Sequence, residues 1–299
     1  MPNRASVIRR WAMRRPPPEP RSIVELIRDG TLDPELAAQI WLLVGARVPI
    51  VVAAEAQGAG KSTLLRAVLD FLPPEVRIVE LAGEAETFEW LPPASELGWP
   101  GTARATAGAD PVRPETTVLL ASELSDHLPI YTWGPAARVF VRAASIGYGI
   151  AATIHADSLD DVLAELCAAP VRLTDDELSH LGVVLVLRPF GDGRRRVVAA
   201  HYLRPVARDV HGHVQRLGPA VLATWDPADD AFEHFGWGVT PELARRVGMR
   251  AGDFEVEVER RREYLAGMVE GGPVETDAVR AAIAAYRPAV SFDALRDDA

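Results

Sequence analysis

Short runs of apolar residues recur between residues 49 and 202, and helical or polar segments separate several of them. Continuous apolar runs of this length are typical of strands that are buried on both faces of a sheet. Strands that alternate with helices indicate a largely parallel sheet with helices on its faces. The sequence therefore predicts an α/β fold, with strands within 49–54, 76–81, 117–121, 149–154, 183–187 and 197–202.

Other segments carry apolar residues at the helical period. Leu36, Ile40 and Leu43 lie on one face of a predicted helix at 33–44. Ser158 and Thr174 each precede acidic residues, which is typical of a capped helix start. Further helices are predicted at 22–30, 61–72, 240 onward, 253–268 and 276–286.

The pattern changes from about residue 203. Two strand-like runs, 221–225 and 231–235, flank a polar turn and predict a β-hairpin appended to the sheet. We therefore expect a core with its hairpin over 22–236 and a small C-terminal helical module over 237–299. Residues 1–21 are rich in Pro and Arg, and we expect a flexible basic tail there.

A glycine-bearing loop lies between the run at 49–54 and the helix predicted from Lys61. Its sequence matches the phosphate-loop pattern G-x-x-x-x-G-K-[ST] at every defined position but the first, where Glu55 replaces glycine. In such loops backbone N–H groups and the helix N-terminus bind phosphates, the lysine reaches the outer phosphates, and the hydroxyl, here Ser62, binds Mg²⁺. The predicted nucleotide-binding residues are Gly58, Ala59, Gly60, Lys61, Ser62 and Thr63. A glycine-rich turn that merely resembles the motif is the alternative, and Glu55 places a carboxylate at the mouth of the anion site.

Two further side chains follow predicted strands, at the sheet edge where parallel α/β folds bind ligands. Glu123 ends the run from Thr117, and there it could orient a water or hold a magnesium-bound one. His155 ends the run from Gly149 and could contact the terminal phosphate or Glu123. From pattern alone, each could equally be a surface or structural residue.

Composition limits the function class. The 299 residues carry a formal net charge of -10, which argues against a protein that coats nucleic acid. The sole cysteine, Cys167, excludes an internal disulfide and fits a reducing cytoplasm; its apolar neighbours predict a buried, unreactive thiol. No apolar run has the length of a membrane-spanning helix, and the histidines at 201, 211 and 213 lack a cysteine that would complete a structural zinc site.

The sequence resembles the secretion and pilus-assembly ATPases of the type II and type IV systems, especially their archaeal-type and tight-adherence branch. The resemblance runs through the phosphate loop, Thr117 to Glu123, Thr153 to Ser158 and the helix with Glu259-Arg260-Arg261. It implies a RecA-like P-loop NTPase core, ATP and Mg²⁺ as ligands, Glu123 as the Walker B glutamate and His155 as the histidine-box residue. It also implies a cytoplasmic hexamer, at times peripheral to the inner membrane, that acts on an inner-membrane platform protein to drive export or filament assembly.

The sequence departs from that family in several places. Ala82 and Gly83 stand where an acidic pair belongs, with Glu84 or Glu86 as candidate substitutes, and Ser125 replaces an arginine. The stretch from Glu123 to Gly147 is longer than in that family. We also expect the resemblance to cover only the family's C-terminal motor domain. A catalytically impaired scaffold is therefore the main alternative to an ATPase, and an unrelated P-loop enzyme such as a small-molecule kinase is a third reading.

Overall fold

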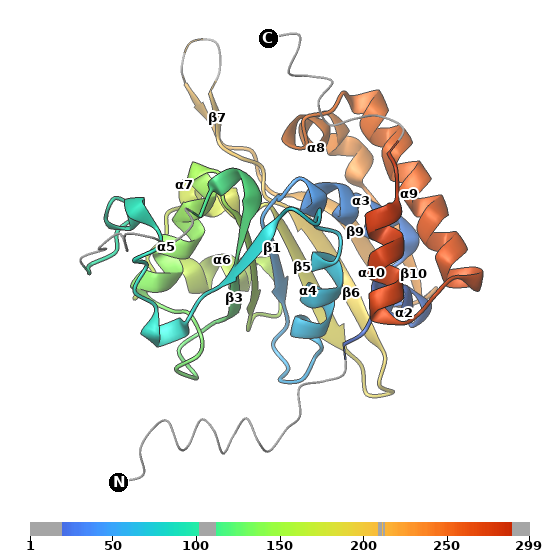
Figure 1. The fold of residues 1–299 in the computed structure, drawn as a ribbon, viewed down its shortest axis with the longest axis horizontal. Coiled ribbons are helices and arrows are strands. Elements are labelled where there is room, and N and C mark those ends of the chain that lie inside the picture. The colour runs from blue at the N-terminus through green and yellow to red at the C-terminus, as the bar shows by residue number, and fades with distance from the viewer. Residues whose placement is uncertain (1–19, 102–111, 209–210, 212, 289–299) are drawn as a thin grey trace.

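The computed structural model describes residues 20–101, 112–208, 211 and 213–288, so nearly all of the predicted tail lies outside the described residues. Its centre is an eight-stranded sheet in the order β10-β9-β6-β5-β1-β4-β3-β2 (Figure 1). Neighbouring strands from β2 to β5 are parallel, whereas β6, β9 and β10 are antiparallel to their neighbours. The strands are β1 (Ile50–Ala53), β2 (Arg77–Glu80), β3 (Thr117–Leu124), β4 (Gly149–Ile154), β5 (Val183–Pro189), β6 (Arg195–Tyr202), β9 (Ala220–Asp226) and β10 (Ala231–His234), with a separate small pair β7 (Ala207–Arg208) and β8 (Val214–Gln215).

The sheet confirms the predicted α/β class with a mainly parallel sheet and an appended hairpin, β9–β10. Strand β1, which leads into the glycine-bearing loop, has β4 and β5 as neighbours. Strand β4 therefore separates β1 from β3, the strand that carries Glu123. This order is consistent with a RecA-like P-loop NTPase fold.

The helices begin largely where the sequence predicts. Ser22 and Thr174 each form a capping box, and Asp33 accepts a hydrogen bond from the backbone N–H of Leu36. No helix was predicted at α5, which begins at a proline. The α-helices are α2 (Ile23–Arg28), α3 (Pro34–Gly45), α4 (Lys61–Leu69), α5 (Pro135–Ala143), α6 (Leu159–Cys167), α7 (Asp175–Leu178), α8 (Thr240–Arg246), α9 (Ala251–Gly271) and α10 (Thr276–Ala285).

Helices cover both faces of the sheet, and each face has its own hydrophobic core. Val52 of β1 belongs to a core shared with α2, α3, α4 and the C-terminal helices. Val51 and Ala53 belong to the other, which α5, α6 and α7 complete. Figure 1 shows the sheet between α5–α7 on one side and α3, α9 and α10 on the other. Helices α8 to α10 thus pack into a core that they share with the sheet.

A polar cluster fixes the turn of the appended hairpin. The Asp230 carboxylate accepts hydrogen bonds from Arg196 Nε at 2.8 Å and Nη2 at 3.0 Å, from Arg194 Nη1 at 2.9 Å and from Trp225 Nε1 at 2.8 Å. The Arg196 side chain is buried and also donates to the carbonyl of Asp29 at the end of α2. The cluster therefore ties the hairpin both to β6 and to an N-terminal helix.

The prediction that Cys167 is buried was wrong, because its side chain is exposed. Helix α6 buries Leu159, Val162 and Leu166, and Cys167 follows at the last position, off that face. Desolvation and the charge of Asp175 raise the pKa of the thiol, so little of it is thiolate near neutral pH. This environment agrees with the expectation of an unreactive thiol.

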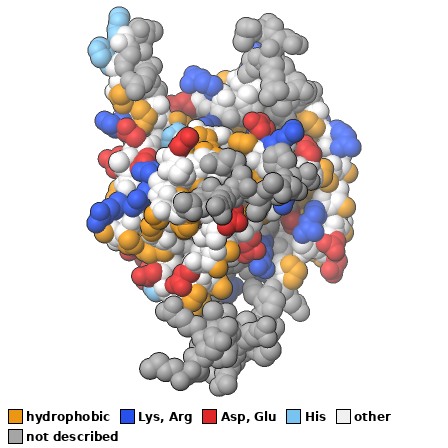
Figure 2. Space-filling view, turned by 60° about the vertical axis from the view of Figure 1, so that its left-hand side comes forward, with side chains coloured by type: hydrophobic (Ala, Val, Ile, Leu, Met, Phe, Trp, Pro, Cys, Tyr) orange, Lys and Arg blue, Asp and Glu red, His pale blue; other side chains and the backbone are white. Residues whose placement is uncertain are grey.

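Acidic and basic side chains are interspersed over the face in Figure 2, where the described residues do not gather into one patch of a single sign. Among the helices that the structure describes, none combines the length and apolarity needed to cross a membrane.

Candidate functional site

The glycine-bearing loop connects β1 to the first turn of α4. Gly58 has φ 76° and Gly60 has φ 103°, a region of backbone space that residues with a Cβ rarely adopt. A Cβ at position 58 would meet nothing within 4 Å, so the loop backbone there borders open space. Helix α4 begins at Lys61, and the loop therefore presents backbone N–H groups and a helix N-terminus to one space.

That space is a cavity of about 1340 Å³. It exceeds the roughly 300–1000 Å³ typical of sites for small molecules. The sequence-predicted residues Gly58 to Thr63, Glu123 and His155 all line it. The structure thus brings together every candidate site residue, from segments that lie up to about a hundred positions apart in the chain.

Lys61 lines the cavity and is 7% exposed. Its Nζ donates to the carbonyl oxygen of Ala54 at 3.0 Å and lies 3.2 Å from His155 Nδ1. Burial lowers the pKa of Lys61, and the charges of Glu123 and Glu55 act in the opposite direction. The ammonium group is therefore partly desolvated, with hydrogen-bonding capacity directed toward the cavity.

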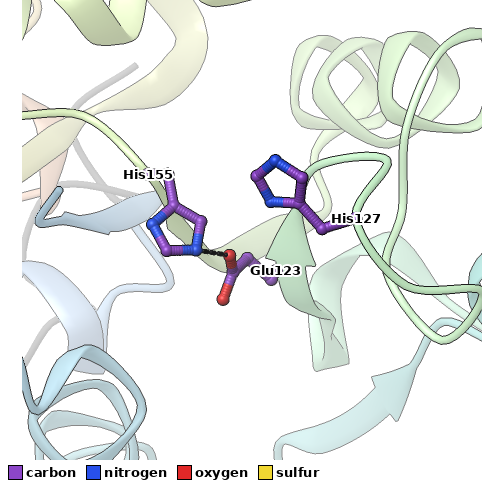
Figure 3. A group of neighbouring side chains, drawn as sticks. All are labelled: Glu123, His127 and His155. Atoms are coloured by element: carbon purple, nitrogen blue, oxygen red, sulfur yellow. Dashed lines mark ion pairs between the residues drawn. The ribbon is translucent and has the colours of Figure 1, made fainter. Parts of the chain in front are cut away.

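Glu123 and His155 meet because β3 and β4 are parallel neighbours whose carboxyl ends coincide. His155 Nε2 lies 2.5 Å from Glu123 Oε1 (Figure 3). The pairing of β3 with β4 is irregular there: Ala121 faces Ala152 and Leu124 faces Ile154, which leaves two residues of β3 opposite Thr153 alone. Such a bulge re-aims a side chain, and here it accompanies a glutamate turned into the cavity.

The Glu123 side chain is buried, with 7% exposure. The sequence pattern alone also allowed Glu123 to be an ordinary surface glutamate at the end of a strand. Its burial argues against that alternative. Despite the short distance to His155, Oε1 accepts no hydrogen bond of good angle from the described residues. A buried carboxylate oxygen without an aligned donor is uncommon, and it has capacity for a water or a cation.

Two residues that the sequence did not predict join the site. Arg195, at the start of β6, donates from Nε to the carbonyl oxygen of Ala59 at 2.9 Å. His127, in the loop after β3, has its ring centroid 5.5 Å from that of His155. Both line the cavity, as do Arg21 and Glu25. For Arg195 the chain gives no local signal. For His127 the signal that could have found it is its position in the stretch after Glu123, which is longer than in the family that the sequence resembles.

The acidic residues around Ala82 and Gly83, where the resemblance expects an acidic pair, do not reach the cavity. The buried carboxylate of Glu86 accepts hydrogen bonds from the backbone N–H groups of Ala82, Thr87 and Phe88 and from the indole of Trp90. Glu80 accepts from the hydroxyl of Ser122. Neither glutamate is among the described residues that line the cavity, and Glu84 is likewise absent from its lining. The suggestion that Glu84 or Glu86 substitutes for the pair therefore has no support in the geometry.

Glu55 lies at the exposed mouth of the site, as the motif departure predicts. Its backbone carbonyl oxygen is 3.1 Å from His155 Nδ1. The same ring nitrogen is thus within hydrogen-bond distance of both this carbonyl and Lys61 Nζ. An acceptor and a donor compete for one atom, and the tautomer of His155 decides between them.

No protein-family model matches the sequence. Two proteins of Methanocaldococcus jannaschii are similar. Uncharacterized protein MJ1287 is 27% identical over 83% of this chain and 92% of its own length, and uncharacterized protein MJ0900 is 26% identical over 84% of this chain and 46% of its own. The chain thus spans most of the first relative and about half of the second, and neither name states an activity.

Among solved structures, the ATPase DotB of Legionella pneumophila aligns with 82% of this chain and 64% of its own. The sequence identity is 13% and the TM-score is 0.28, so this likeness carries no argument about fold or function.

Proposed function

We propose that this chain binds ATP with Mg²⁺ and hydrolyses it, as a motor of the secretion and pilus-assembly type that its sequence resembles. The observation that carries the proposal is the convergence of Lys61, His155 and Glu123 on one cavity at the carboxyl ends of parallel strands. This edge is where open α/β sheets bind ligands.

The phosphate loop supplies what a nucleotide would need. Gly58 leaves room for close approach, Lys61 offers a charge-assisted hydrogen bond, and the N-terminus of α4 favours an anion. Ser62 is exposed in the first turn of α4 and lines the cavity, so its hydroxyl is available to hold Mg²⁺. The donor set therefore fits the magnesium salt of a nucleoside triphosphate. The bound ion would neutralise charge on the phosphate oxygens.

The remaining residues would position the attacking water. Glu123 has a buried oxygen without an aligned donor and can accept a hydrogen bond from water there. His155 lies between Glu123 and Lys61, with one ring nitrogen close to each, and would link the carboxylate to the lysine. Lys61 would stabilise charge on the outer phosphate. Catalysis of this kind is positioning and electrostatic stabilisation rather than covalent chemistry.

A second candidate is a nucleotide-binding scaffold without turnover. One observation favours it: Glu86 is fully engaged in its own loop, and no described residue from 80 to 86 lines the cavity. The carboxylate of Glu55 at the cavity mouth also repels phosphate. Binding with little hydrolysis would be the result.

Phosphate release by the purified protein tests the first proposal. Wild type should release phosphate from ATP and Mg²⁺, and Lys61→Ala should fall to background. Arg66→Ala is the matched control, because Arg66 is an exposed basic residue of the same helix that does not line the cavity. Equal phosphate release from wild type and Lys61→Ala, with and without a membrane fraction, would rule out the ATPase.

A thermal-shift titration with ATP then separates the scaffold from a protein that binds no nucleotide. Ligand at a hundred times its dissociation constant adds about 2.7 kcal/mol to the free energy of unfolding. A shift in wild type that Lys61→Ala lacks supports the scaffold. No shift in either protein excludes nucleotide binding altogether.

The assembly and the partner rest on the sequence resemblance alone. We propose a hexamer in the cytoplasm that contacts an inner-membrane platform protein and drives export or filament assembly. Sedimentation velocity with and without ATP tests the ring, since a hexamer of 32.4 kDa chains is readily distinguished from a monomer. A monomer under both conditions, at micromolar concentration, would exclude a stable ring.

A further inference from the structure

Three side chains converge at the carboxyl ends of β3 and β4: Glu123, His127 and His155 (Figure 3). Each offers one ligand atom, and these atoms all lie within 4.8 Å of one another. We propose that they form a binding site for a transition-metal dication of the Zn²⁺ class. A bound ion would hold Glu123 and His155 in an arrangement that blocks turnover.

The donor set selects the kind of metal. Two imidazoles and one carboxylate suit zinc and its neighbours in the first transition row. Zinc sites with three protein ligands and one open position are a common arrangement. Mg²⁺ prefers an all-oxygen, octahedral shell, so the hydroxyl of Ser62 and the phosphates are its natural partners instead. The two ions therefore belong to different parts of one cavity.

A second observation points to a ligand at this position. Glu123 is 7% exposed, and its Oε1 has no aligned hydrogen-bond donor among the described residues. A buried acceptor without a hydrogen bond is unfavourable for the folded state. A cation between Glu123 and His155 would remove that cost, because it coordinates the oxygen directly.

Binding needs only side-chain adjustment. Zinc bonds of about 2.0–2.1 Å place tetrahedral ligand atoms about 3.3 Å apart. His155 Nε2 and Glu123 Oε1, now 2.5 Å apart, would separate slightly, and the His127 ring would move inward. His127 is exposed in a loop, so its ring can turn and the ion has a path from solvent.

The hydrogen bonds of His155 make metal binding and the arrangement proposed for hydrolysis mutually exclusive. When Lys61 donates to Nδ1, the ring proton is on Nε2, the nitrogen that lies 2.5 Å from Glu123 Oε1. Coordination needs Nε2 without its proton, and Nδ1–H can then donate to the Glu55 carbonyl at 3.1 Å. A ligating histidine usually donates its other N–H in this way. The metal thus selects one tautomer and turnover needs the other.

Metal binding can be measured without nucleotide, by competition of the full chain with a colorimetric zinc chelator. Wild type should bind one Zn²⁺ at this site. His127→Ala should bind it at least about tenfold more weakly, since loss of an outer-shell partner alone costs about 10–100-fold. The double variant His211→Ala/His213→Ala is the control, because these rings form a second close histidine pair, with centroids 6.1 Å apart, outside the cavity lining. Circular dichroism checks that each variant is folded.

Lys61→Ala keeps this test independent of the proposed ATPase. It lacks the phosphate-binding lysine but keeps all three metal ligands, and it loses a positive charge near His155. It should therefore bind Zn²⁺ at least as tightly as wild type. Wild-type affinity in His127→Ala, or a loss only in the double variant, would overturn the metal site.

The inhibitory role rests on the proposed function and has its own readout. If the protein hydrolyses ATP, stoichiometric Zn²⁺ should lower phosphate release by wild type at least about fivefold in excess Mg²⁺. His127→Ala should lose less than half of its own zinc-free rate. Equal fractional inhibition of both proteins would contradict the inhibitory role. A protein without ATPase activity would remove this role and leave the binding result intact.

Discussion

Two carboxylates of this molecule lie in opposite environments, and the contrast separates a structural cluster from the candidate functional site. Asp230 is in an open turn, yet four hydrogen bonds from Arg194, Arg196 and Trp225 saturate it. Hydrogen bonds from Arg196 and Trp225 hold the pKa of Asp230 far below its usual range. Glu123 is buried, and one of its oxygens has no aligned donor. The saturated group contributes to stability, whereas the unsaturated group has capacity for a ligand.

The sharpest way to break this comparison is Glu123→Gln. We expect phosphate release to fall about 10²–10⁴-fold, the range that a positioned acid or base contributes. The melting temperature should change little, because the amide keeps the shape of the side chain and one oxygen acceptor. Single-turnover phosphate release and calorimetry measure the two effects on the same sample.

Glu123→Asp is the companion variant, since it keeps the charge and shortens the reach. Partial recovery of turnover would support a positioning role. A large drop in melting temperature with undiminished turnover would instead place Glu123 with the structural clusters.

Arg196→Met tests the cluster around Asp230, where we expect a loss of stability rather than a loss of phosphate release. The substitution keeps an apolar stem next to Trp225 but removes the donors to Asp230 and Asp29. Hydrogen bonds to charged groups contribute about 1.5–3 kcal/mol. We therefore expect a loss of about 2–3 kcal/mol in the free energy of unfolding, measured by urea denaturation.

Arg194→Met is the control for that loss. Arg194 also contacts Asp230, but its side chain is 46% exposed against 6% for Arg196. Exposed ion pairs contribute little to stability, so Arg194→Met should lose clearly less than Arg196→Met. Equal losses in the two variants would show that burial is not what gives the cluster its strength.

His234 is intermediate between Asp230 and Glu123, because only one of its two ring nitrogens has a hydrogen-bond partner in the part of the chain that the structure describes. Its Nε2 is 2.8 Å from Asp33 Oδ2, whereas its buried Nδ1 has no hydrogen bond from the described residues. Burial lowers the pKa of His234, but the hydrogen bond that its ring donates to Asp33 and the charges of Asp33 and Glu35 raise the pKa by more, so the net shift is upward. The resulting stability is present below the unfolded pKa of about 6.5 and is lost as pH rises through the higher folded value.

His234→Gln should therefore cost about 1 kcal/mol near pH 6 and less near pH 9. Urea denaturation of both proteins at the two pH values measures the difference. A gap that widens as pH rises would contradict the raised pKa.

The smallest expected effect is at Ser125, which stands where the secretion ATPases that the sequence resembles carry an arginine. It is 7% exposed, and its hydroxyl has no partner among the described residues. Ser125→Ala removes that unsatisfied group, and we expect the free energy of unfolding to rise by up to about 1 kcal/mol. A clear loss of stability on thermal denaturation would indicate that the hydroxyl binds an ordered water.

Local pattern was sufficient for the sheet and for most helices. The runs that form β1 and β4 are apolar throughout because both faces of these strands are covered, and such runs are readable from sequence. Helix α5 was missed because Val139-Phe140-Val141 has the composition of a strand, and the helix depends on tertiary packing. Cys167 was misplaced because an apolar neighbourhood does not say which side of a helix faces the core.

The positions of some site residues could be predicted from the strands that they follow in the sequence. Glu123 and His155 end neighbouring parallel strands, so their position at one edge follows from the fold class. Their contact also needed the bulge in β3, which has no signature in the sequence. His127 and Arg195 reach the cavity from an irregular loop and from an antiparallel strand, and only the three-dimensional arrangement brings them there.

Arg195 and Arg196 are successive residues with different tasks. Arg195 donates to the glycine-bearing loop at Ala59, and Arg196 joins the end of α2 to the turn of the hairpin. The position of β6 along its neighbouring strands is therefore fixed by two separate contacts. Removing one residue from the turn at 191–193 would slip the strand by one position and misalign both arginines at once. Homologous chains should accordingly vary the composition of that turn freely while keeping its length.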